Sequence, residues 1–133
     1  MKNIRLLILL FLIIPACAIF TREDKKVVQV VHNNDAVDST EYELVVFDQG
    51  YETWLLMQPS QQHSAEYYKA KNRIYVSEWN YRYMNQARYG SQYGSYLDYD
   101  TFIDYGYEFE RRLFYYFKYF EESNGVRLEP GGR

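Results

Sequence analysis

An aromatic stripe near the C-terminus is the sequence feature that most restricts the fold. Large apolar side chains recur at i, i+4, i+8 and i+11 within residues 105–123, and they are Phe109, Leu113, Phe117 and Phe120. This spacing places all four on one face of an α-helix, and the following Asn124-Gly125 pair is typical of a left-handed helix end. The segment therefore predicts a helix that must bury one aromatic face against the rest of the chain.

Aromatic residues are frequent throughout the chain, and the fold must be stabilised by a core built from them, because it cannot be stabilised by disulfide bonds. The chain has 16 Tyr, 8 Phe and 2 Trp but a single cysteine among 133 residues. Since each large ring buries about 150–250 Å², a few of them suffice for a small core. We expect Phe and Trp to form the core with Tyr at its edge, while the surplus of Tyr leaves open a second interpretation, a binding face rich in Tyr.

The segments before the last helix predict strands first and helices afterwards. Residues 42–47 are β-branched or apolar and read as a strand, and residues 27–31 have a similar preference that suits an edge strand. Two helical turns follow from residue 51 to the loop at Pro59, and a longer helix follows from residue 65 to 85 with Ser64 as its N-cap. Glu78 and Arg82 are four residues apart on this helix in the favourable order for an ion pair.

Two segments are expected to be irregular or to return to the sheet. Residues 88–107 contain repeated Tyr and Gly and predict an irregular excursion that packs back on the domain. Residues 126–128 are expected to pair with the strand at 42–47. The chain therefore predicts an α+β fold, a small single domain at 41–128 with two or three long-to-medium helices packed on a short two- or three-stranded sheet, and a frayed tail at 129–133.

The N-terminus has the pattern of a lipoprotein signal. Lys2 and Arg5 precede the apolar run 6–14, and a small residue, Ala16, precedes Cys17. This pattern predicts a signal peptide at 1–16, cleavage before Cys17, lipidation of the Cys17 sulfur, and a lipidated tether at 17–40. The alternatives are a cleaved signal without lipid and a retained membrane anchor, although a bilayer span needs about 20 apolar residues.

Lipidation at Cys17 would fix both location and partners. Two or three acyl chains hold a protein durably on a membrane, so we expect a cell-envelope protein that is anchored through its N-terminal lipid and faces the periplasm or the exterior. Loss of Lys2 and Arg5 with the signal changes the net charge from −3 to −5, and this acidity argues against a nucleic-acid partner. A protein or a glycan remains as partner, and the sequence has no motif for a cofactor.

The densest polar set surrounds the second tryptophan. We take as binding candidates Arg73, Trp79, Asn80, Arg82, Tyr89 and Tyr93. Weak catalytic candidates are Glu78, Asp100 and Asp104, because paired carboxylates beside a tryptophan suit glycoside hydrolysis. The alternative is a structural network of arginines and carboxylates that holds the excursion to the long helix. His63 and Glu66 lack a third ligand for zinc, so we expect no metal.

Four segments, taken in order, form a pattern that is shared with a known family. They are Tyr42-Glu43-Leu44-Val45-Val46 leading to Asp48-x-Gly50, then Asn72-Arg73-x-Tyr75-Val76-x-Glu78-Trp79-Asn80-x-Arg82, then Ile103-Asp104-Tyr105-Gly106-Tyr107-Glu108, then Tyr116-Phe117-x-Tyr119-Phe120. Residues 42–128 thereby resemble a family of small predicted bacterial lipoproteins known only as a domain of unknown function. The resemblance implies lipid anchoring and a small α+β domain, and it implies no catalytic residue, substrate or cofactor.

Three functions are therefore compatible with the sequence. The first is a membrane-anchored cell-envelope lipoprotein with a binding or structural role and no assigned biochemical activity. The second is a small carbohydrate-active enzyme that uses Glu78 with Asp100 or Asp104. The third is a subunit of an envelope protein assembly, which predicts that Tyr89, Tyr93, Tyr96 and Tyr99 form one exposed patch.

Overall fold

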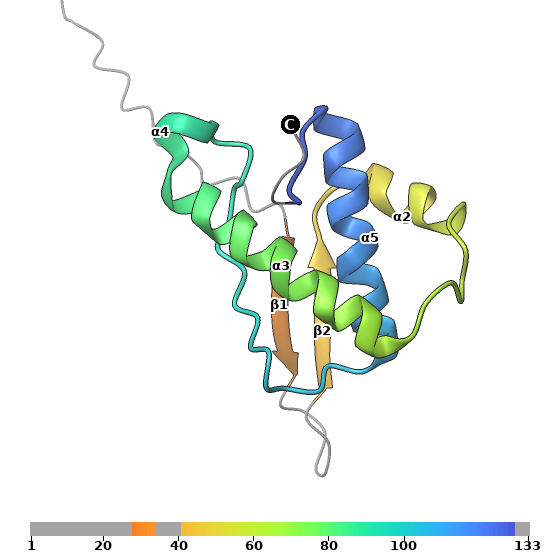
Figure 1. Ribbon diagram of the computed structural model, residues 1–133. Helices are drawn as coiled ribbons and strands as arrows, with labels where there is room; N and C mark the ends of the chain where they lie inside the picture. Colours follow the sequence, from red (N-terminus) through yellow and green to blue (C-terminus); the bar gives the residue numbers. More distant parts are fainter. Residues whose placement is uncertain (1–27, 34–40, 130–133) are drawn as a thin grey trace, which may run out of the picture.

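The computed structural model describes residues 28–33 and 41–129, and this part of the chain has an α+β fold (Figure 1). Its elements are the strands β1 (Val28–Asn33) and β2 (Glu41–Val46) and the helices α2 (Gln49–Leu56), α3 (Ala65–Met84), α4 (Gln86–Tyr89) and α5 (Tyr107–Asn124). Helix α3 packs against α5, and α5 also contacts α2 and β2. The predicted fold class is confirmed.

The sheet has two antiparallel strands within the described residues. Its register runs from Val28 opposite Val46 to Asn33 opposite Glu41. Val28 and Leu44 are buried on the inner face. The edge strand expected near residues 27–31 is thus present as β1, inside the segment that the sequence assigned to the tether.

The predicted return of residues 126–128 to the sheet is wrong. These residues form no strand, and β2 pairs with β1 instead. The backbone N–H of Leu128 donates to Glu121 Oε1 at 2.7 Å, and the Leu128 side chain is buried. The segment after α5 is therefore attached to that helix through a side chain and not to the sheet through its backbone.

The helix boundaries follow from local sequence signals. The Asp48 carboxylate accepts a hydrogen bond from the Gly50 N–H at 2.9 Å, and Ser64 Oγ accepts one from the Tyr67 N–H at 3.3 Å. Both side chains cap a helix N-terminus. Gly125 ends α5 with φ of +62°, in the left-handed region. The predicted cap at Ser64 and the predicted end at Gly125 are both confirmed.

The core is built from aromatic rings of α3, α5 and the segment between them. All four residues of the C-terminal stripe are buried, and they pack with Trp79 of α3 and with Leu97 of the excursion. Tyrosine does not stay at the edge of the core as expected, since several tyrosines have at most 1% of their surface exposed: Tyr51, Tyr68, Tyr75, Tyr93 and Tyr116. The excursion is irregular from residue 90 to 106, as predicted, apart from its start in α4.

Several predictions fall outside the described residues. The signal peptide at 1–16, Cys17, most of the expected tether and residues 130–133 of the expected tail are among them. Within residues 28–33 and 41–129, no helix is both long enough and apolar enough to span a membrane.

Candidate functional site

Arg82 joins three separate segments of the chain. Its Nε donates to Glu78 Oε1 at 2.6 Å on the same helix, so the predicted ion pair is formed. Its Nη1 donates to the Tyr93 hydroxyl at 2.9 Å, and its Nη2 donates to the Arg127 carbonyl at 2.7 Å. The guanidinium also lies over the rings of Tyr89 and Tyr93. Arg82 thereby ties the excursion and the C-terminal segment to α3.

Trp79 and Asn80 hold the next part of the excursion. Trp79 Nε1 donates to the Ser95 carbonyl at 2.8 Å. The Asn80 amide donates to the Leu97 carbonyl and accepts from the Leu97 N–H, both at 2.9 Å. Asn80 thus satisfies both backbone groups of Leu97, as a neighbouring strand would. Trp79 has no exposed surface, so its ring is not available for stacking on a sugar in this structure.

The three weak catalytic candidates lie in two different places. Asp100 and Asp104 are exposed in the excursion, where each accepts a hydrogen bond from a backbone N–H two residues ahead. The Ile103 carbonyl beside Asp104 accepts from Lys69 Nζ at 2.8 Å. Glu78 lies nine residues further along α3 than Lys69, which is about 13 Å along the helix axis. The described residues therefore do not bring the carboxylates together beside Trp79.

The remaining binding candidates do not form one surface. Arg73 is exposed on α3, Tyr89 is half-buried and Tyr93 is buried. Of the four tyrosines that were expected to share an exposed patch, only Tyr96 is largely exposed, at 54%. The expected exposed patch of Tyr89, Tyr93, Tyr96 and Tyr99 is therefore absent.

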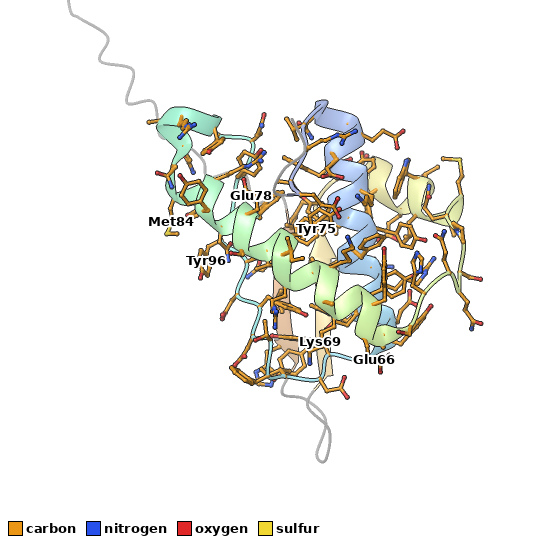
Figure 2. All side chains as sticks on the ribbon, in the orientation of Figure 1. Glu66, Lys69, Tyr75, Glu78, Met84 and Tyr96 are labelled. Carbon is orange, nitrogen blue, oxygen red and sulfur yellow. The ribbon has the colours of Figure 1, made fainter. Side chains whose placement is uncertain are left out.

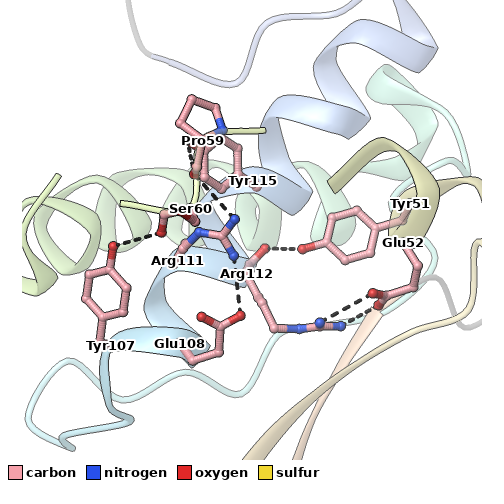
Figure 3. A network of polar contacts seen from close by, with 9 residues as sticks. All are labelled: Tyr51, Glu52, Pro59, Ser60, Tyr107, Glu108, Arg111, Arg112 and Tyr115. Carbon is pink, nitrogen blue, oxygen red and sulfur yellow. Dashed lines mark hydrogen bonds and ion pairs between the residues drawn. The ribbon is translucent and has the colours of Figure 1, made fainter. Parts of the chain in front are cut away.

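A second polar network attaches α2 to the first turns of α5 (Figure 3). Arg112 forms a two-pronged ion pair with the Glu52 carboxylate. The Tyr51 hydroxyl donates to the Arg112 carbonyl at 2.6 Å. The buried Tyr51 thereby has its hydroxyl satisfied, and α2 is fixed at two points.

The same network attaches the loop after α2 to α5. Arg111 is nearly buried, and its guanidinium donates to Glu108 and to the Pro59 carbonyl, each at 3.3 Å. The Tyr107 hydroxyl donates to the Ser60 carbonyl at 3.3 Å. The contacts with Pro59 and Ser60 join parts of the chain that are about fifty residues apart, so a local sequence pattern does not reveal them.

A carboxylate is buried between α3, α5 and the excursion. The Asn72 amide donates to Glu110 Oε2 at 2.7 Å and to the Glu110 carbonyl at 2.8 Å. The Tyr99 hydroxyl donates to the same carboxylate at 3.1 Å. Burial raises the pKa of Glu110 above its ordinary value of 4.5, and the two donors oppose that rise. Burial beside the Glu110 carboxylate raises the pKa of Tyr99, which keeps its hydroxyl protonated as a donor.

The sequence pattern alone does not reveal this buried carboxylate. The available signal was Asn72, a polar residue four positions after Tyr68 and four before Val76 on the apolar face of the predicted helix. A buried amide needs hydrogen-bond partners. That requirement predicts a polar group opposite Asn72, but it does not say which one.

Glu110 should make stability depend on pH in a specific direction. Because its pKa is higher in the folded than in the unfolded protein, the folded state binds this proton more tightly. The ionised carboxylate therefore lowers stability at neutral pH, and this loss is recovered as the pH falls through the folded pKa toward 4.5. We expect the free energy of unfolding of wild type, minus that of Glu110→Gln, to increase as the pH is lowered over this interval.

Urea denaturation of both proteins at a series of pH values measures this difference. Subtracting the variant removes the contribution of the other carboxylates. A difference that stays constant from neutral pH to about 4.5, or that falls, would contradict the prediction.

Within the described residues, no group of three or more His, Cys, Asp and Glu side chains is placed to hold a metal ion. The polar side chains described above instead hydrogen-bond to other parts of the same domain. The arrangement positions loops of the domain.

The chain matches a known protein family over nearly its whole length. The model of a family of unknown function, DUF6146, matches residues 5–131. The chain belongs to DUF6146. This match covers the four segments that carry the resemblance to a family of unknown function, and it also covers the apolar run and Cys17 of this DUF6146 chain. No curated protein and no solved structure matches the chain at a significant level.

Proposed function

We propose that this DUF6146 chain is a lipid-anchored protein of the bacterial cell envelope with a binding or structural role. The observation that carries the proposal is the N-terminal pattern, a positive start and an apolar run that end in Ala16 and the sole cysteine, Cys17. The family match begins at residue 5, so the apolar run, Ala16 and Cys17 lie within the region that the family model matches.

The position of β1 supports a domain that lies close to the membrane. Only residues 18–27 separate Cys17 from Val28, whose side chain is in the core. An extended chain of this length reaches at most about 40 Å. The domain would therefore stay within about its own diameter of the lipid surface.

The polar contacts favour a binding or structural role over catalysis. Trp79, Asn80 and Arg82 all hydrogen-bond to other segments of the domain, and Glu78 is paired with Arg82. The carboxylates that the enzyme hypothesis requires lie in separate parts of the domain. An outer face of the domain is therefore the better candidate for contact with a partner.

The proposal predicts that replacing the Cys17 sulfur with oxygen, as in Cys17→Ser, abolishes lipidation. Full-length wild type, Cys17→Ser and Ala18→Ser are expressed in a bacterial host with a labelled fatty acid, and the intact mass of each protein is measured. Wild type and Ala18→Ser, the matched control, are expected to lack residues 1–16, to carry acyl chains and to enter the detergent phase on partitioning. Cys17→Ser is expected to carry no label and to keep residues 1–16, because its hydroxyl does not accept the lipid.

Other outcomes would reject the proposal in distinguishable ways. A wild-type mass that lacks residues 1–16 but has no acyl chain would indicate an ordinary secreted protein. A full-length wild-type mass without label would indicate a retained anchor.

A further inference from the structure

Helix α3 carries a second apolar stripe on the side that faces away from the domain. Three large side chains, Tyr67, Ile74 and Tyr81, are spaced seven residues apart, and Met84 follows three residues after Tyr81. The exposed fractions of these four side chains are 37%, 41%, 45% and 68%. Two small exposed residues, Ala70 and Ser77, lie between them. These six residues, the outer stripe, occupy the a and d positions of a heptad repeat.

The outer stripe has ring contacts with its own domain at two places: Tyr67 packs against His63 and Phe114, and Tyr81 packs against Tyr89. The opposite side of the helix supplies the core contacts through Tyr68, Tyr75, Val76 and Trp79. A helix on the surface of a globular domain normally has one apolar face and one polar face. A second stripe with heptad spacing is the pattern of a helix that packs against another helix.

The outer stripe is complementary in volume to an antiparallel copy of itself. When Ile74 of one chain faces Ser77 of the other, Tyr81 faces Ala70 and Tyr67 faces Met84. Each medium or large side chain at the centre then opposes a small one. A hollow lined by Arg73, Ile74, Ser77 and Glu78 lies at this centre, and it suits the knob that Ile74 of the second chain would form.

The borders of the outer stripe are also complementary in charge. Within each chain Lys71 pairs with Glu129 and Glu78 pairs with Arg82. In the antiparallel register Lys71 of each chain also lies beside Glu78 of the other, and two-fold symmetry makes this second contact twice. A parallel register would also pair opposite charges, Glu66 with Lys71 and Arg73 with Glu78. However, it would place Tyr81 opposite Tyr81, where the two rings are too large for one layer, and Ala70 opposite Ala70, where a void would remain. Side-chain volume therefore selects the antiparallel arrangement.

We propose that two copies of this chain form an antiparallel homodimer through the outer stripes of their α3 helices. Figure 2 shows the labelled Glu66, Glu78 and Met84 distributed along this helix, which has 20 residues and so is about 30 Å long. One helix face is narrower than the roughly 800 Å² per partner of a standard interface. The dimer therefore forms at high protein concentration, and the membrane anchoring proposed above would supply that concentration.

The first test is whether the outer stripe controls the oligomeric state. The full chain is purified in detergent, and analytical ultracentrifugation is run at two concentrations for wild type, Ala70→Arg and Thr53→Arg. Wild type and the control Thr53→Arg, an exposed position on α2, are expected to show a dimer that increases with concentration. Ala70→Arg is expected to weaken the dimer by about tenfold or more, because a large side chain fills the space for Tyr81.

Two results of this test would overturn the proposal. One is a wild-type protein that stays monomeric at both concentrations. The other is an Ala70→Arg variant that dimerises as wild type does. Circular dichroism of each variant confirms that the fold is kept, which is expected because residue 70 is exposed.

The second test fixes the orientation and uses the Cys17→Ser background, so that it does not depend on lipidation. One sample carries Ala70→Cys, another carries Tyr81→Cys, and a third is their mixture. In the antiparallel dimer only the mixture forms a disulfide-linked dimer on oxidation, because identical residues lie about 16 Å apart along the helix axis. A linked dimer in either single sample would overturn the proposed arrangement, and no linked dimer in any sample would overturn the dimer.

Discussion

Replacement of Trp79 by alanine is expected to lower the free energy of unfolding by about 3–5 kcal/mol, the typical cost of truncating a large aromatic side chain in a core. Trp79 has no exposed surface. Its ring packs against Phe120, Tyr93 and Tyr116 with centroid distances of 4.7, 5.2 and 5.7 Å. The variant also leaves the Ser95 carbonyl without its donor. Since small domains are stable by only about 5–15 kcal/mol, this variant should be close to unfolding.

Urea denaturation followed by far-ultraviolet circular dichroism measures the effect without relying on tryptophan fluorescence. The matched control is Tyr96→Ala, which truncates an aromatic ring that is 54% exposed and is expected to change stability by at most about 0.5 kcal/mol. If the two variants lost similar amounts, Trp79 would not be the centre of the core.

The sequence predicts most of the helices because their signals are local. The spacing of Phe109, Leu113 and Phe117 defines the buried face of α5, and Ser64 and Gly125 mark the ends of helices through their own side-chain and backbone chemistry. None of these signals depends on a distant part of the chain. The family of unknown function is predictable for a similar reason, since its motifs are contiguous segments.

Strand pairing is harder to predict because it depends on distant partners. Residues 28–33 and residues 126–128 have a comparable preference for extended structure, yet only the first segment pairs with β2. The choice is decided by burial of Val28 and by the hydrogen bond that takes the Leu128 N–H to Glu121. Neither contact is visible in a local pattern.

The polar set around Trp79 was interpreted as a candidate site because its residues are adjacent in sequence. Successive residues of a helix point in directions about 100° apart and do not face each other. Glu78 therefore turns toward Arg82, Trp79 enters the core, and Asn80 reaches the backbone of Leu97. The polar groups that do meet, such as Asn72 and Glu110, are 38 residues apart in the sequence, and only the tertiary fold brings them together.

Arg82→Ala is expected to lower the free energy of unfolding by about 2–4 kcal/mol, because three hydrogen bonds from one charged group are lost. The Glu78 carboxylate, whose side chain is mostly buried, would keep its charge without a partner. Arg82→Lys is expected to recover only part of the loss, since an ammonium group can replace the pair with Glu78 but cannot span Tyr93 and the Arg127 carbonyl together. Arg73→Ala, which removes an exposed arginine from the same helix, is the matched control and should cost little.

Hydrogen exchange distinguishes this positioning role from a general loss of stability. Among the described residues, Arg82 is joined outside its own helix to the excursion and to the segment after α5, so the amides near residues 93–97 and 126–128 should lose protection first. The amides of α5 between residues 109 and 120 should lose protection only with global unfolding. Unchanged protection near residues 93–97 and 126–128, together with unchanged stability, would mean that these hydrogen bonds do not hold the excursion. Arg82 would then have a charged group without a structural role, and it would become the first residue to test for contact with a ligand.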